Sequence, residues 1–105
     1  DPEMSRGLGD VYKRQQIVEY NIYLKPKVND MKIEQIEKYR RLGLNIAYYR
    51  KIKGLSQSRL AELLDISRTH MSRIETADCA VSLDVVFDIC DVLGITPDRL
   101  FDFTK

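Results

Sequence analysis

Residues 56–75 read SQSRLAELLDISRTHMSRIE, and the pattern of this stretch decides the fold. Ser56 and Ser67 each precede a helical pattern, and a serine hydroxyl in that place can accept a hydrogen bond from a first-turn amide. The stretch therefore predicts two short helices, 57–64 and 68–75, joined by a sharp turn. The apolar spacing turns one face of each helix toward a shared core, through Leu60, Leu64, Ile66, Met71 and Ile74.

The flanking sequence from residue 31 onward is also helical in pattern. Apolar spacings of three and four predict a first helix of about five turns, ended by Gly54. Ser82 and Gly94 bound a fourth helix, and the Thr96-Pro97 pair opens a fifth. No alternating strand pattern is present, so we expect an all-α domain of five helices. The predicted core stripes are Ile33, Ile36, Leu42, Ile46 and Tyr49 on the first helix and Leu83, Val86, Cys90 and Leu93 on the fourth.

The N-terminal segment, residues 1–30, has no sustained period of two or 3.6 residues. The stretch SRGLGDVYKRQ at 5–15 resembles translated sequencing-adapter sequence. The stretch IVEYNIYL at 17–24 could form a short strand or an added helix, which Pro26 would end. We therefore expect a non-domain extension over residues 1–30, artefactual or disordered, and a single domain over 31–105.

Composition excludes several classes of protein. With 44% hydrophobic and 31% charged residues, the chain is typical of an ordinary globule. No apolar run approaches the about 20 residues that cross a bilayer, and no secretory h-region is present, so we expect no membrane association and a cytoplasmic location. Cys79, expected in an exposed loop, Cys90 and His70 are too few for a disulfide framework or a zinc site, and we expect no metal and no cofactor.

The sequence also lacks the residue combinations that catalytic sites require. The chain has no Ser–His–acid or Cys–His set, no glycine-rich phosphate loop and no paired carboxylates on separate elements, so we expect no enzyme.

The net charge of +1 hides an asymmetry: residues 38–73 hold nine Lys and Arg against two acids, and residues 74–105 hold seven acids against two bases. The basic half could orient a polyanion, or the mixed charge could only keep the protein soluble. A stripe of Asp84, Asp88 and Asp91 on the fourth helix reads as a solvated face rather than a metal site.

Two strings carry a family resemblance. Residues 42–75, LGLNIAYYRKIKGLSQSRLAELLDISRTHMSRIE, and residues 82–101, SLDVVFDICDVLGITPDRLF, resemble the Cro and lambda-repressor type (XRE-like) of helix-turn-helix domain. The resemblance covers more than half of the chain. It implies a compact five-helix, lambda-repressor-like DNA-binding domain that usually binds operator DNA as a two-fold dimer. It also implies transcription regulation, most often as a repressor.

The family pattern can be carried onto this sequence residue by residue. It implies that the recognition helix, about Ser67–Glu75, enters the major groove, and that Gln57 meets the DNA backbone or an outer base. Arg68 and Thr69 are assigned to bases, because an arginine can bind guanine O6 and N7. Arg73 is assigned to a base or a phosphate, and His70 contacts a phosphate or is simply solvated. The full DNA-binding set is Gln57, Ser67, Arg68, Thr69, His70, Ser72 and Arg73.

Other positions carry a structural implication. Arg50 and Glu75 match family positions that form an ion pair between the first and third helices, although Arg50 could instead meet a phosphate. Asp65 and Ala77 stand where the family usually has glycine. The Asp65 turn requires a positive φ, which aspartate tolerates better than most other residues.

The expected oligomeric state and operator follow from the small number of base pairs that one recognition helix covers. One recognition helix covers only a few base pairs, so we expect a homodimer on a pseudo-palindromic double-stranded operator, with recognition helices about 34–36 Å apart. The candidate dimer surface is 95–103, where Leu100, Phe101 and Phe103 add apolar area, although Phe101 or Phe103 could fold back onto the first helix. The alternative function is an antitoxin-like or adaptor module whose main partner is another protein.

Overall fold

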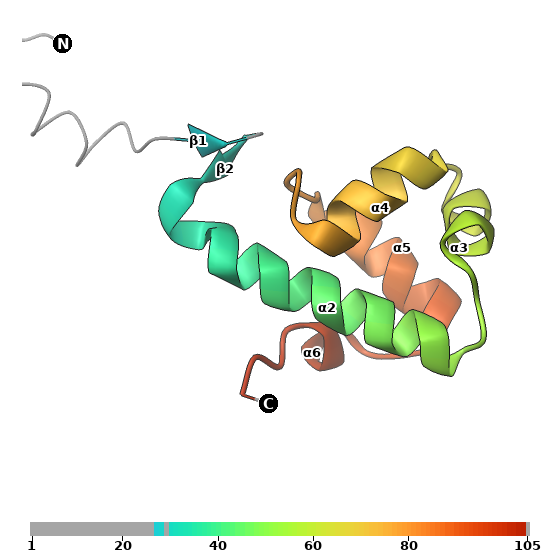
Figure 1. Ribbon diagram of the computed structural model, residues 1–105. Coiled ribbons are helices and arrows are strands. Elements are labelled where there is room, and N and C mark those ends of the chain that lie inside the picture. Colours follow the sequence, from blue (N-terminus) through green and yellow to red (C-terminus); the bar gives the residue numbers. More distant parts are fainter. Residues whose placement is uncertain (1–26, 29, 105) are drawn as a thin grey trace, which may run out of the picture.

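The computed structural model describes residues 27–28 and 30–104, in which five α-helices form one packed unit (Figure 1). The prediction of five helices is confirmed, and the second to fifth helices begin where predicted, whereas the first begins at Ile36, after the Ile33 expected on it. No helix in this described part of the chain is long and apolar enough to cross a membrane. The stretch 17–24 lies outside the described residues. The helices are α2 (Ile36–Ile52), α3 (Gln57–Leu64), α4 (Arg68–Thr76), α5 (Leu83–Leu93) and α6 (Pro97–Leu100).

A short hairpin precedes the helices and was not predicted. Strands β1 (Lys27–Val28) and β2 (Met31–Lys32) pair antiparallel, and a 3-10 turn, η1 (Ile33–Gln35), leads into α2. Two-residue strands are too short to show a period of two, which is why the sequence pattern missed them. The hairpin crosses the domain boundary expected at residue 31. Ile33, expected in the core stripe of the first helix, lies in η1 and is 52% exposed, while Met31 is buried.

The core lies between α2, α3, α4 and α5, and its stripe on α5 differs from the predicted one. Leu83, the first residue of α5, is 60% exposed and borders a groove instead of entering the core. Ile89, which was not predicted, is fully buried, and Cys90 is buried as expected. The buried residues of α5 follow the i, i+3, i+4, i+7 spacing of one helix face, namely Val86, Ile89, Cys90 and Leu93.

Serine hydroxyls cap three of the helices. The Oγ of Ser56 accepts from the amide of Arg59 at 3.0 Å, and the Oγ of Ser67 accepts from the amide of His70 at the same distance. Ser82 caps α5 in the same way. Thr96 occupies the predicted cap position of α6, but its hydroxyl accepts no such bond. The short α6 instead begins with proline, whose missing N–H needs no partner at that position.

Two helix ends use left-handed residues other than glycine. Asp65 ends α3 with φ 58°, as predicted for the turn, and Ala77 ends α4 with φ 61°. The Asp65 turn reverses the chain within three residues, because the amides of Asp65 and Ile66 donate back to carbonyls of α3. The turn directs α4 across α3 at the angle that buries Leu60 and Met71 together.

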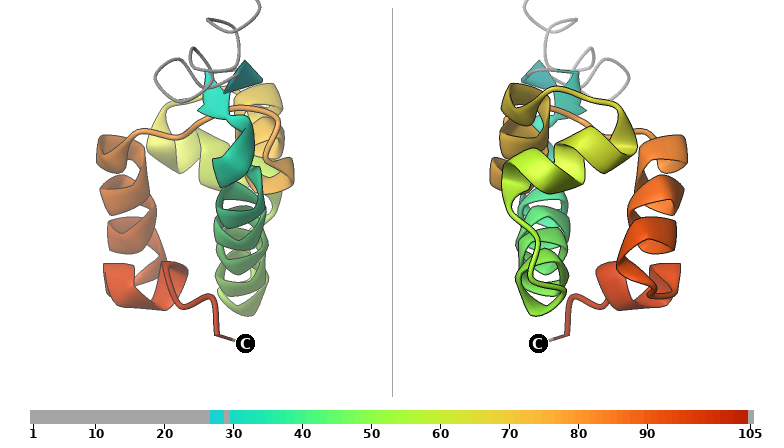
Figure 2. Two further views of the ribbon diagram at one scale, coloured as in Figure 1. Left: turned by 90° about the vertical axis from the view of Figure 1, so that its left-hand side faces the viewer. Right: turned by 90° about the vertical axis from the view of Figure 1, so that its right-hand side faces the viewer.

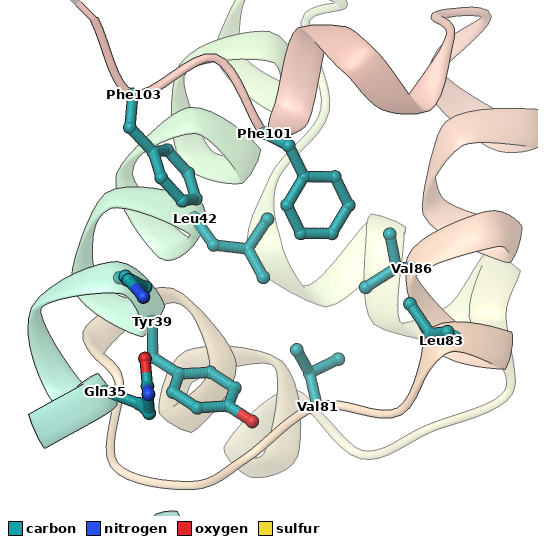
Figure 3. A pocket seen from close by; sticks show the side chains of 9 residues that line it. Gln35, Tyr39, Leu42, Val81, Leu83, Val86, Phe101 and Phe103 are labelled. Atoms are coloured by element: carbon teal, nitrogen blue, oxygen red, sulfur yellow. The ribbon is translucent and has the colours of Figure 1, made fainter. Parts of the chain in front are cut away.

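The C-terminal segment folds back along α2. The Nη1 of Arg41 donates to the carbonyl of Phe103 at 2.8 Å, and the Nδ2 of Asn45 donates to the carbonyl of Leu100 at 2.9 Å. Leu100 is fully buried and Phe103 packs half-buried against the core; Figure 3 shows the Phe103 ring beside Leu42 of α2. Two of the three apolar residues expected to contact a second copy are therefore used inside the domain, and Phe101 remains 42% exposed.

Gly43 allows α2 and α4 to cross at close range. A Cβ at Gly43 would lie 2.8 Å from the carbonyl oxygen of Ile74 and 2.8 Å from the carbonyl carbon of Glu75. Both are backbone atoms, which cannot rotate away as a side chain can. The hydrogen at Cα is therefore the largest group that this crossing admits, and α4 lies directly against α2 (Figure 1).

We expect Gly43→Ala to lower the free energy of unfolding by about 1–3 kcal/mol or more, because the new methyl group must push two backbones apart. The measurement is the urea midpoint of the purified protein. Leu44→Ala is the matched control, since Leu44 is exposed on the same helix and should change the midpoint little. Equal urea midpoints for Gly43→Ala and the unmodified protein would mean that the crossing of α2 and α4 can accommodate a methyl group.

Candidate nucleic-acid interface

The α3–α4 pair forms one end of the molecule. Figure 2 shows these two helices and the β1–β2 hairpin on the side away from the C-terminus, and Figure 1 shows the hairpin at the start of α2 with α3 near the other end of that helix. Leu60 and Ala61 of α3 pack against Met71 and Ile74 of α4, and all four side chains are buried. Because the apolar sides of both helices face inward, their polar sides are presented to solvent at this end.

The outer face of α4 carries the polar residues predicted to read DNA. Arg68, Thr69 and Arg73 are exposed, and Ser72 is half-buried beside them. Positions 68, 69, 72 and 73 share one side of a helix because each turn takes 3.6 residues. His70 is half-buried at the flank of this face. The structure thus brings the residues of the predicted recognition helix onto a single surface.

Two arginines on this face, Arg68 and Arg73, have no side-chain partner among the described residues. Within residues 27–28 and 30–104, neither Arg68 nor Arg73 makes a hydrogen bond or salt bridge to another side chain. Arg59 on α3, by contrast, pairs with Glu62 at 2.8 Å. Ser67 already accepts the capping bond, yet its hydroxyl can still donate one. The face therefore offers donors, which suit phosphate oxygens and the acceptor edges of bases.

Arg50 and Glu75 form the ion pair implied by the family resemblance. The Nε of Arg50 lies 2.6 Å from Oε2 of Glu75, and its Nη2 donates to Oε1 at 3.1 Å. The Nη1 of Arg50 donates to the carbonyl of Leu55 at 2.8 Å, so each of the three guanidinium nitrogens donates to a protein group. The two residues are 7% and 8% exposed. This bidentate pair joins the end of α2 to the end of α4.

Gln57 belongs to the same network. Its Nε2 donates to Oε1 of Glu75 at 2.9 Å, which ties the first turn of α3 to the last turn of α4. The sequence indicated a DNA contact for Gln57 and gave no sign of this internal bond. The second N–H of the amide is still available for a ligand. A glutamine and a glutamate eighteen residues apart leave no periodic signal, so only the folded arrangement reveals their contact.

A hollow of about 380 Å³ lies beside the outer face of α4. It is lined by residues of α4, of the loop that follows α4 and of the hairpin turn: Asp30, Ser67, Thr69, His70, Arg73, Cys79 and Ala80. Cys79 was expected to be exposed, but it is half-buried because the loop folds onto the core. Burial raises the pKa of the Cys79 thiol, although the charge of Arg73 acts in the opposite direction.

The acidic part of the chain is displayed on another element. Asp84, Asp88 and Asp91 are all exposed on α5. Across the described residues, no three His, Cys, Asp or Glu side chains are arranged to hold a metal ion. An anionic ligand is therefore favoured at the α3–α4 end, where Arg68 and Arg73 are exposed, over the acidic face of α5.

Residues 46–100 match the helix-turn-helix family, and this range covers all of α3, α4, α5 and α6. The chain belongs to the helix-turn-helix family. The resemblance drawn from its sequence is confirmed, and its fold is that of a lambda-repressor-like domain.

Individual relatives agree with the family. Control protein C.BamHI of Bacillus amyloliquefaciens is 44% identical over 51 residues, which are 49% of this helix-turn-helix chain and 63% of that protein. The match thus spans less than two thirds of that relative. The uncharacterized HTH-type transcriptional regulator YazB of Bacillus subtilis (strain 168) is 36% identical over 58 residues, 55% of this chain and 84% of YazB.

A solved structure extends the likeness to three dimensions. The crystal structure of the restriction-modification controller protein C.AhdI from Aeromonas hydrophila superposes with a TM-score of 0.60 at 31% identity. The superposition covers 62% of this chain and 98% of C.AhdI. The fold and family of this chain are therefore those of DNA-binding regulators of transcription.

We expect Arg50→Met or Glu75→Leu alone to lower the free energy of unfolding by about 3–5 kcal/mol, because each leaves a buried charge without its partner. The double variant should recover most of that loss, since no buried charge remains. Urea denaturation of the four proteins measures both effects.

The exposed pair Arg59–Glu62 is the matched control for this cycle. Both of its side chains are more than half exposed, so Arg59→Met and Glu62→Leu should each change stability by about 1 kcal/mol or less. Single variants of Arg50 and Glu75 that unfold no more easily than these controls would contradict the role assigned to the buried pair.

Proposed function

We propose that this helix-turn-helix protein is a sequence-specific regulator of transcription, acting as a repressor, and that it reads double-stranded DNA with α4 in the major groove. The observation that carries the proposal is the outer face of α4, where Arg68 and Arg73 are exposed and unpaired among the described residues. Family membership supports DNA as the ligand. A regulator of this family performs no chemistry on its ligand, so we propose no enzymatic activity.

Each side chain of the face has a proposed role. Arg68 and Thr69, in the first turn of α4, meet base edges, with the Arg68 guanidinium bound to guanine O6 and N7. Ser72 contacts a base edge or a neighbouring phosphate. Arg73 and His70, toward the flank, meet phosphates that fix the register of the helix in the groove. Gln57, already held by Glu75, offers its second N–H to a phosphate of the backbone.

The working unit is proposed to be a homodimer on a pseudo-palindromic operator. The proposed contact surface is centred on Leu83, Phe87 and Phe101, which are 60%, 46% and 42% exposed. Leu83 and Phe101 border an apolar groove of about 420 Å³ between α2, α5 and the C-terminal segment (Figure 3). Exposed aromatic and aliphatic groups gathered beside a groove are the usual anchors of a protein interface.

We propose restriction-modification genes as the regulated class. The support is C.AhdI, a restriction-modification controller protein; the match covers 98% of the length of C.AhdI. Selecting bound sequences from a random duplex pool gives the operator. Finding that operator beside restriction or modification genes supports this class, and finding it only beside unrelated genes contradicts it.

On the selected operator, we expect Arg68→Ala to weaken binding by about 1–3 kcal/mol and to relax the preference at one base pair. Fluorescence anisotropy with the operator and its single-base variants measures both. Arg99→Ala, an equal change of charge at an exposed residue of α6, should leave affinity and preference nearly unaltered. If Arg68→Ala weakened every duplex equally, Arg68 would contact a phosphate rather than a base.

Phe101→Asp should weaken self-association at least tenfold, since losing a buried aromatic anchor costs about 2 kcal/mol or more. Sedimentation with and without half-site and full-site duplexes measures the assembly. Leu44→Asp places the same charge on an exposed apolar residue of α2, outside the proposed surface, and should leave the dimer intact. A single copy bound to a selected site without symmetry would rule out the dimer.

A further inference from the structure

Two lysines oppose each other across the β1–β2 hairpin. Lys27 and Lys32 are partners in the antiparallel register, and both side chains are exposed. Directly opposed residues in such a ladder have Cβ atoms about 5 Å apart, and like charges at that separation destabilise the pair. Among the described residues, no carboxylate forms an ion pair with either ammonium group. The hairpin therefore holds two like charges together without compensation from the described part of the protein.

The direction of these side chains follows from the pleat of the hairpin. Met31 is 1% exposed and anchors β2 to the domain. Successive residues of a strand point to opposite faces, so Lys32 points away from the core that holds Met31. Lys27, opposite Lys32 in the ladder, shares that outward face. Met31 thus fixes both ammonium groups on the solvent side of the hairpin.

The hairpin lies next to the reading face of the domain. Asp30, in its turn, lines the same hollow as Thr69 and Arg73 of α4. Figure 1 shows the hairpin at the start of α2, and Figure 2 shows it on the side of the domain that carries α4, away from the C-terminus. A duplex seated on the outer face of α4 would carry its phosphates past this hairpin.

We propose that the β1–β2 hairpin is a second DNA-binding element, in which Lys27 and Lys32 bind phosphates that flank the groove entered by α4. The inference rests on the proposed function and adds to it a contact that the helix-turn-helix motif does not include. A phosphate near both ammonium groups replaces their mutual repulsion with two attractive interactions. This contact carries no sequence information, because every base pair presents the same phosphates.

Asp30 acts against this contact. Its carboxylate lines the hollow between the hairpin and α4, and it would repel a phosphate that approaches either element. The two lysines and the aspartate therefore have opposite expected effects on affinity, although all three belong to one short segment. This difference in sign separates a charge effect from damage to the hairpin.

The test compares the full chain with three variants on the selected operator and on an unrelated duplex over a range of salt concentrations. Lys27→Ala and Lys32→Ala should weaken binding to both duplexes alike, and the double variant should lower the slope of log K against log salt by about 1–2. Asp30→Asn should strengthen binding to both, and asparagine also tolerates the φ of 68° at this turn.

Lys53→Ala is the matched control, because its ammonium lies near Gly94 at the end of α5. This variant removes the same charge and should leave affinity and slope unaltered. If the lysines only prevent the hairpin edges from pairing with other chains, the double variant will aggregate more readily while its salt slope stays unaltered, and the proposal is wrong. If the unmodified protein binds neither duplex, the proposed function itself fails, which is a distinct outcome.

Discussion

The buried contact between Arg50 and Glu75 determines how α4, the proposed recognition helix, is presented. It joins the end of α2 to the end of α4 through two hydrogen bonds, and Gln57 adds the start of α3 to the same carboxylate. A buried carboxylate that accepts three bonds in fixed directions leaves α4 little freedom to tilt or slide. The position of α4 is fixed by the bonds of Glu75 to Arg50 and Gln57 as well as by the apolar packing of Met71 and Ile74.

This ion pair depends on the close crossing of α2 and α4. Gly43 brings the α2 backbone against the carbonyls of Ile74 and Glu75, about two turns before Arg50 reaches the Glu75 carboxylate. Beyond this crossing, the left-handed turn at Asp65 sets the angle between α3 and α4. A side chain at the crossing, an extended turn or an unpaired charge would each shift the reading face relative to the rest of the domain.

Positive and negative side chains are displayed on different sides of the protein. On one side, α4 presents Arg68 and Arg73, unpaired among the described residues, and the hairpin presents its lysines, whereas α5 presents three aspartates near Leu83 and Phe87. A polyanion is attracted to the first surface and repelled by the second, so the acidic face remains available to a protein partner. The chain thus separates its proposed DNA-reading surface from its proposed self-association surface.

The sequence by itself determined the five helices, their serine caps, the left-handed Asp65 and the polar face from Arg68 to Arg73, because each depends on neighbours within a few residues. Tertiary structure alone decided the exposure of Leu83, the burial of Phe103, the Gln57–Glu75 bond and the two-residue hairpin strands. Those features depend on which distant segments meet. A periodic pattern records which face of a helix is apolar, but not which partner covers it or where that partner ends.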